Sequence, residues 1–160
     1  MNAESPSALN VPATWPNARY VVGVDGSECS KTALRYALRL ADLTGASVEA
    51  LIAWRYPPTY GPAYTPMEWA AGDDAVEILR DSIDATVGPE RPANLSAVAQ
   101  EGITAQVLIE RSGGADLLVV GSRGHGGFAG LLLGSVSSAC AEHAHCPVLV
   151  VHQDHRPLQR

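Results

Sequence analysis

One glycine-rich stretch, residues 121–135, has a composition that suits the binding of an anion. It reads GSRGHGGFAGLLLGS and holds six glycines together with Arg123 and His125. Each glycine costs conformational entropy on folding, so a cluster indicates that the backbone must go where a side chain would obstruct it. A tight turn, a close packing contact and a backbone cradle for an anion are the uses that this composition allows.

The end of this stretch offers further groups for a phosphate. Gly134 and Ser135 stand where a helix is expected to begin, and the first N–H groups and the dipole of a helix favour an anion. Ser135 can cap that helix or bring its hydroxyl to a phosphate oxygen, and Arg123 can add a positive charge. Two better-known phosphate motifs do not fit. The chain has no lysine after Lys31 for a GxxxxGK[ST] loop, and GxGxxG would open the first βα unit rather than follow a late strand.

Simpler roles are open to several of these polar residues. Asp25 ends the first apolar run and can cap the turn or helix that follows. Arg123 and His125 can point to solvent. His143 and His145 look like a metal-binding pair, but two residues apart on a helix they face different directions, so a zinc site is not expected.

Hydrophobic periodicity predicts strands and helices that alternate along the chain. Apolar runs predict strands over 19–25, 47–54, 95–101, 115–122 and 147–152. Helical spacing predicts helices over 27–45, 73–88, 103–114 and 135–146, and the proline- and tyrosine-rich residues 55–68 predict a long loop. Ser27 or Ser30 is expected to cap the first helix, which Gly45 ends.

Strands joined by short helical crossovers lie parallel, with a right-handed connection. We therefore expect an α/β fold, an open, doubly wound sheet of about five parallel strands with helices on both faces. In such sheets ligands bind beyond the carboxyl ends of the strands, where the strand order switches. The glycine-rich stretch leaves the carboxyl end of a predicted strand, which places it at that edge.

Composition is typical of one globular domain. The chain has 160 residues, of which 46% are hydrophobic and 18% charged. We expect a flexible N-terminal tail over 1–18, a domain over 19–153 and a C-terminal tail over 154–160.

The net charge of −6 argues against a nucleic-acid partner, which needs a basic face. The three cysteines are odd in number and lack zinc spacing, so we expect a cytoplasmic protein. No apolar run nears the ~20 residues of a membrane span, so we expect no membrane contact.

Taken together, the motifs resemble the universal stress protein family in its nucleotide-binding branch. That branch carries G-x2-G-x9-G-[S/T], which here is Gly121, Gly124, Gly134 and Ser135. Further matches are VVGVDGSECS and LIAW around the first two strands, and ADLLVVGSRGHGG and CPVLVV around the last two. The resemblance covers about residues 18–152. It implies a Rossmann-like sheet in the order 3-2-1-4-5, ATP binding with Mg²⁺, and a homodimer through the last strand, Val148 to Val151.

The same resemblance implies the residues of an adenine nucleotide site. Asp25 would contact the ribose and the metal–phosphate region as the expected metal ligand, and a backbone group near Ala53 would recognise adenine. Ile52 stands where many members have histidine. The implied cofactor-binding set is Val24, Asp25, Gly26, Ala53, Gly121, Arg123, Gly124, His125, Gly134, Ser135 and Val136. At Gly124 a side chain would block both close phosphate approach and a backbone conformation with positive φ.

Three functions are consistent with such a site. The first is an ATP-binding regulatory module of the stress response. The second is a slow ATPase or a nucleotidyl-transfer domain. The sequence offers it no lysine at the loop and no obvious general base, and the resemblance implies binding or feeble hydrolysis more than turnover. The third is a dimerisation module without ligand, and the intact glycine motif counts against it.

Overall fold

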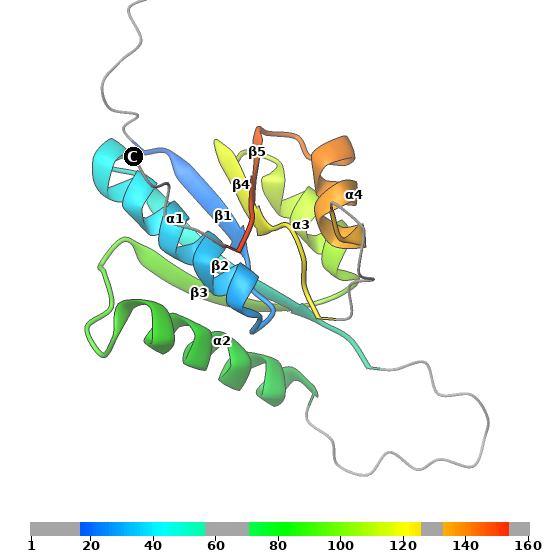
Figure 1. The fold of residues 1–160 in the computed structure, drawn as a ribbon, viewed down its shortest axis with the longest axis horizontal. Coiled ribbons are helices and arrows are strands. Elements are labelled where there is room, and N and C mark those ends of the chain that lie inside the picture. Colours follow the sequence, from blue (N-terminus) through cyan, green and yellow to red (C-terminus); the bar gives the residue numbers. More distant parts are fainter. Residues whose placement is uncertain (1–16, 57–70, 126–132, 154–160) are drawn as a thin grey trace, which may run out of the picture.

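Five parallel strands form one sheet in the order β3-β2-β1-β4-β5, which confirms the expected architecture (Figure 1). The computed structural model describes residues 17–56, 71–125 and 133–153. The predicted tails at 1–16 and 154–160, nearly all of the predicted loop and the middle of the glycine-rich stretch lie outside these residues. The strands are β1 (Arg19–Gly23), β2 (Ser47–Trp54), β3 (Leu95–Glu101), β4 (Leu117–Gly121) and β5 (Val148–Val151).

Four helices in the described residues cover the two faces of the sheet (Figure 1). They are α1 (Glu28–Thr44), α2 (Ala71–Val87), α3 (Thr104–Ser112) and α4 (Ser135–His143). Helices α1 and α2 pack on one face and α3 and α4 on the other, each pair over its own cluster of buried side chains. Neighbouring residues Val21 and Val22 belong to opposite clusters, as the alternation of a strand buried on both faces requires.

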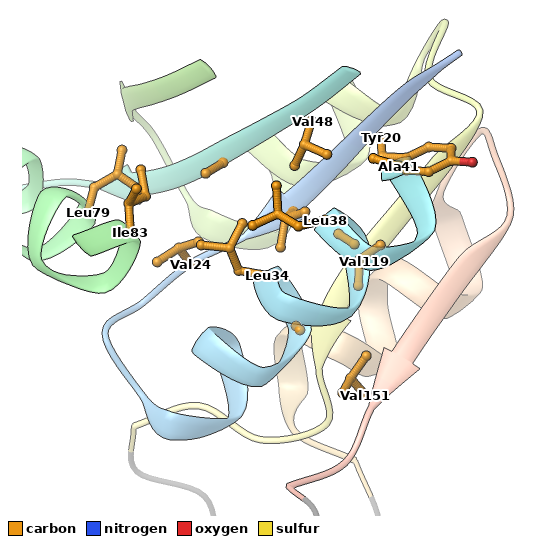
Figure 2. Packing of buried hydrophobic residues seen from close by; sticks show 14 of the residues in the cluster. Tyr20, Val24, Leu34, Leu38, Ala41, Val48, Leu79, Ile83, Val119 and Val151 are labelled. Carbon is orange, nitrogen blue, oxygen red and sulfur yellow. The ribbon is translucent and has the colours of Figure 1, made fainter. Parts of the chain in front are cut away.

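Helix α1 follows directly from its sequence. Ser27 is its N-cap, and the Ser27 hydroxyl accepts a hydrogen bond from the Ser30 amide. Gly45 ends the helix with φ 77°, a left-handed conformation that glycine adopts without strain. Leu34, Leu38 and the alanines between them recur at helical spacing and pack on the sheet beside Val24 and Val119 (Figure 2).

The last helix is shorter than its sequence pattern predicts. The prediction reached residue 146, whereas α4 ends at His143 and Ala144 is already extended, with φ −62° and ψ 149°. Pro147 accounts for the difference, because a proline disfavours helical backbone at the residue before it, here Cys146. Asp73 and Asp74 lie in the first turn of α2, where their carboxylates interact favourably with the positive end of the helix dipole.

Two expectations about the whole chain can be compared with the structure. Cys29, Cys140 and Cys146 are free thiols. Among the helices of the described residues, none combines the length and the apolar composition needed to cross a membrane.

The buried face of α1 predicts a large difference between two leucines of the same helix. Leu34 is fully buried, whereas 77% of Leu43 is exposed. We expect Leu34→Ala to lower the free energy of unfolding by about 2–5 kcal/mol, and Leu43→Ala by less than about 0.5 kcal/mol. Urea unfolding followed by circular dichroism measures both. Equal losses would show that α1 does not bury this face.

Candidate nucleotide site

A cavity of about 480 Å³ opens at the carboxyl edge of the sheet, where β1 and β4 lie side by side. The chain leaves β1 toward α1 on one face and leaves β4 toward α4 on the other, which opens a crevice between the two connections. Nine of the residues implied by the sequence motifs line this cavity: Val24, Asp25, Gly121, Arg123, Gly124, His125, Gly134, Ser135 and Val136. The structure therefore brings together two segments about a hundred residues apart in the sequence.

Asp25 is held at the cavity by the turn that precedes α1. Its Oδ1 accepts hydrogen bonds from the Ser27 amide at 2.9 Å and from the Ser27 hydroxyl at 2.5 Å. Burial alone would raise the pKa of Asp25, but these bonds and the neighbouring His125 outweigh it, so the pKa lies below the ordinary value of 3.8. Asp25 thus both caps its turn and presents a carboxylate, ionised at neutral pH, in the lining of the cavity.

Gly124 lies directly against this carboxylate. A Cβ at Gly124 would collide with Oδ2 of Asp25. The expectation that Gly124 needs a positive φ is wrong, since its backbone is outside the left-handed region. Glycine is required here because the backbone and a carboxylate oxygen occupy adjacent space.

His125 joins the same two segments through the main chain. Its Nε2 lies 2.9 Å from the carbonyl oxygen of Asp25, a distance suited to a hydrogen bond in which the ring N–H donates. The His125 side chain is exposed at the rim of the cavity, so the suggestion of a solvent-facing ring is partly right. The contact ties the turn after β1 to the connection after β4.

The start of α4 presents main-chain donors to the cavity. Its N-cap is Gly134, which has no side chain to cap the helix, and Ser135 is the first helical residue. Of the two roles open to Ser135, the structure therefore excludes that of the N-cap. The Gly134 amide donates to the Ser122 carbonyl at 2.7 Å. The amides of Ser135, Val136 and Ser137 have no intrahelical acceptor, because the first turn of any helix lacks one. They are the donors available to an anion.

Much of the remaining lining is apolar, and the implied set contained none of the residues that β2 and α3 contribute to it. They are Leu51 of β2 and Thr104 and Leu108 of α3. Leu108 packs close to the sheet, since a Cβ at Gly23 would be 3.1 Å from its Cδ1. Buried aliphatic residues in α3 carry no motif, and only the placement of α3 beside β1 brings them to the site.

Two of the implied residues, Gly26 and Ala53, are not part of the lining. Gly26 has φ 84°, and a Cβ there would be 2.9 Å from Cγ2 of Ile78, so this glycine serves the turn and its contact with α2. Ala53 lies in β2 beyond Leu51, the last β2 residue that pairs with β1.

The main chain of Ala53 nevertheless faces the cavity side of β2. The Leu51 carbonyl points toward β1, where it accepts from the Val24 amide at 2.8 Å, and the Trp54 carbonyl points toward β3, where it accepts from Gly102. Because main-chain groups alternate in direction along a strand, the N–H and C=O of Ala53 point toward β1 at a level where β1 has ended.

Within the described ranges, no group of three or more His, Cys, Asp or Glu side chains is arranged to hold a metal ion. His143, at the end of α4, lies 3.7 Å from the carboxylate of its neighbour Glu142.

The lowered pKa of Asp25 predicts a pH-dependent contribution to stability. A carboxyl group whose pKa is lower in the folded state stabilises the protein above its unfolded pKa, and this contribution is lost as the pH falls through the folded pKa. We expect Asp25→Asn to lower the free energy of unfolding by about 1 kcal/mol at pH 7, since charged acceptors make the stronger hydrogen bonds. The difference from wild type should close below pH 3.8.

Urea unfolding at pH 7, 5 and 3 measures this difference. Asp42→Asn, which changes an exposed carboxylate on α1, is the matched control and should alter stability by less than about 0.5 kcal/mol. A gap between wild type and Asp25→Asn that stays constant down to pH 3 would contradict the argument.

Comparisons with known proteins agree with this geometry. The universal stress protein Rv2623 of Mycobacterium tuberculosis is 33% identical over 137 residues, which are 85% of this chain and 46% of that protein. The chain thus spans about half the length of the curated relatives it matches. The structure of the universal stress protein UspA from Lactobacillus plantarum superimposes with a TM-score of 0.69 at 22% identity, over 86% of this chain and 99% of that one.

A second solved structure contains a ligand. It is a universal stress protein in complex with cAMP, with a TM-score of 0.65 at 28% identity, over 86% of this chain and 98% of that one. The model of the universal stress protein family matches residues 17–152. The chain therefore belongs to the universal stress protein family.

Proposed function

We propose that the chain binds an adenine nucleotide, ATP with Mg²⁺, in this cavity and acts as a nucleotide-dependent regulatory module in the stress response. The observation that carries the proposal is the composition of one continuous cavity, apolar at one end and lined at the other by glycines and the uncapped start of α4. A related protein solved with cAMP supports an adenine nucleotide as the class of ligand.

The apolar end of the cavity suits a purine base. Leu51, Leu108 and Val120 supply apolar contact surface, as ligand pockets commonly do. The outward N–H and C=O of Ala53 would give adenine a donor and an acceptor, which accounts for its selection over bases with the reverse pattern. The apolar surface would bind the ring, and the main chain of Ala53 would orient it.

The opposite end suits phosphate. The amides of Ser135, Val136 and Ser137 and the positive end of the α4 dipole would hold phosphate oxygens. Gly121 and Gly124 allow the backbone to approach closely, and Arg123 adds positive charge at the rim. Local groups must supply this attraction, because the chain as a whole carries a net charge of −6.

Asp25 fits the role of a ligand to Mg²⁺. Mg²⁺ in nucleotide sites is held by one or two carboxylates, phosphate oxygens and water. Asp25 is the carboxylate in the described lining, and its lowered pKa keeps it ionised. The ion would neutralise phosphate charge beside this carboxylate. Without it, Asp25 and a polyphosphate would repel each other.

Binding, rather than turnover, is the activity that these residues favour. The hydrogen bonds from Ser27 hold Asp25 as an acceptor with a lowered pKa, which is unsuited to take up a proton near neutral pH. A regulatory module needs a ligand that stays bound long enough to be sensed by a partner.

We also propose that the chain pairs with a second copy through β5. This strand is at the edge of the sheet, pairs only with β4 among the described strands, and leaves Val148, Leu149 and Val150 partly exposed. An apolar edge promotes aggregation unless it is covered, and a second copy of the same edge would cover it. Carbonyls of Pro147 and Val151 face β4, so the main chain of Val150 faces outward.

Calorimetric titration of nucleotide-free protein tests the nucleotide proposal. We expect one ATP per chain in the presence of Mg²⁺, weaker binding when Mg²⁺ is omitted, and no binding by Gly124→Val, whose side chain would displace Asp25 and fill the cavity. Ser138→Ala, an exposed substitution on α4, is the control and should bind as wild type does. No heat at two temperatures, for wild type and control alike, would contradict the proposal.

Light scattering on a sizing column tests the dimer. We expect twice the mass of one chain for wild type and a single-chain mass for Val150→Pro, which removes an outward amide without removing a hydrogen bond to β4. Val150→Ala trims the side chain but keeps the amide and should stay dimeric. A dimer that survives Val150→Pro would show that the edge of β5 does not form it.

A further inference from the structure

Ser137 connects two parts of the chain through one buried hydroxyl. It lies in the first turn of α4 with 2% of its surface exposed. Its hydroxyl has one proton, which it shares between the Gly134 carbonyl at 3.0 Å and the Ser122 carbonyl at 3.1 Å. A bond to the carbonyl three residues earlier is ordinary for a helical serine. The second acceptor, at the end of a different strand, is not part of the helix.

The Ser122 carbonyl is the point where the two ends of the glycine-rich connection meet. It accepts the Gly134 amide at 2.7 Å as well as the Ser137 hydroxyl. The chain therefore leaves β4 at Ser122 and returns to the same carbonyl at the start of α4. Using both lone pairs of one oxygen fixes the distance between these ends.

Ser122 is in turn fixed to the sheet and to α1. Its amide donates to the Val151 carbonyl at 2.8 Å, at the end of β5. The same carbonyl is 3.2 Å from the thiol of Cys29, in the first turn of α1. The acceptor of Ser137 is thus held by structure that does not depend on Ser137 itself.

Both ends of the connection line the phosphate end of the cavity. Arg123 and Gly124 follow Ser122 directly, and Gly134, Ser135 and Val136 precede Ser137. A change in the distance between Ser122 and Ser137 would move these two groups apart. The apolar end, lined by Leu51 and Leu108, belongs to other elements and would not move with them.

We propose that Ser137 is a positioning residue that fixes the phosphate-binding end of the cavity without contacting the base. The inference rests on the proposed nucleotide function. It assigns the Ser137 side chain a role separate from the anion-binding role of its own amide and that of Ser135, because the hydroxyl proton is shared between two carbonyls and its effect on the ligand passes through Gly134 and Ser122.

Titrations of wild type, Ser137→Ala and Ser138→Ala with two probes test this role. The probes are ATP with Mg²⁺, and adenosine, which carries the base and ribose without phosphate. We expect Ser137→Ala to weaken ATP binding roughly ten-fold, the loss typical of one good hydrogen bond, and to leave adenosine binding within about two-fold. Ser138 is the exposed neighbour of Ser137, and its alanine variant should match wild type for both probes.

The outcomes separate this inference from the proposed function. Wild type that binds neither probe overturns both. If wild type binds ATP and Ser137→Ala binds it equally well, the positioning role alone is overturned. The same holds if Ser137→Ala weakens the binding of ATP and of adenosine equally, since a general loss of structure would affect both probes. If Ser137→Ala does not fold, Ser137→Cys keeps the volume with a weaker donor and should lose ATP affinity to a smaller degree, again without loss for adenosine.

Discussion

The adjacency of β1 and β4 in the middle of a parallel sheet is the constraint on which the rest of the structure depends. Parallel strands end at one edge, so the turn before α1 and the connection before α4 start side by side and diverge to opposite faces. The cavity between them is lined in part by the sheet residues Gly23, Leu51 and Val120. The cavity is therefore a product of the strand order, and the residues at the two strand ends determine only what can bind there.

A partly buried charge is tolerated at this edge because the local turn supplies its hydrogen bonds. Burying a carboxylate is unfavourable unless it is bonded, and Ser27 provides two bonds from the residue that also caps α1. The same short segment thus ends a strand, starts a helix and fixes an ionised group. Gly124 then fits against that group because it has no Cβ. The turn around Asp25 and Ser27 thus holds the charge and caps α1, and Gly124 allows the close approach of the backbone.

Sequence reasoning recovered the elements and most of the polar site, for physical reasons. The spacing of apolar residues distinguishes strands that are buried on both faces from helices that bury one face. The spacing of the glycines identifies the connection that follows β4. The lining from α3 could not be predicted, because Thr104 and Leu108 reach the cavity only through the crossover that places α3 beside β1. Ser137 also carried no signal, since a serine in a first helical turn is common. Gly124 was singled out partly for a positive φ that it does not have, and its contact with Asp25 could not be predicted because that contact depends on tertiary structure.

The joint at Ser122 has a consequence for what sequence comparison can detect. Its bonds to Val151, Gly134 and Ser137 all use main-chain atoms of Ser122, which every residue type except proline possesses. The Ser122 side chain adds one weaker contact, from its Oγ to the Cys29 sulfur at 3.7 Å, so the joint itself depends on the main chain more than on the residue type. A sequence motif records residue types. It therefore leaves Ser122 unspecified, although both ends of the glycine-rich connection depend on the main chain of this residue.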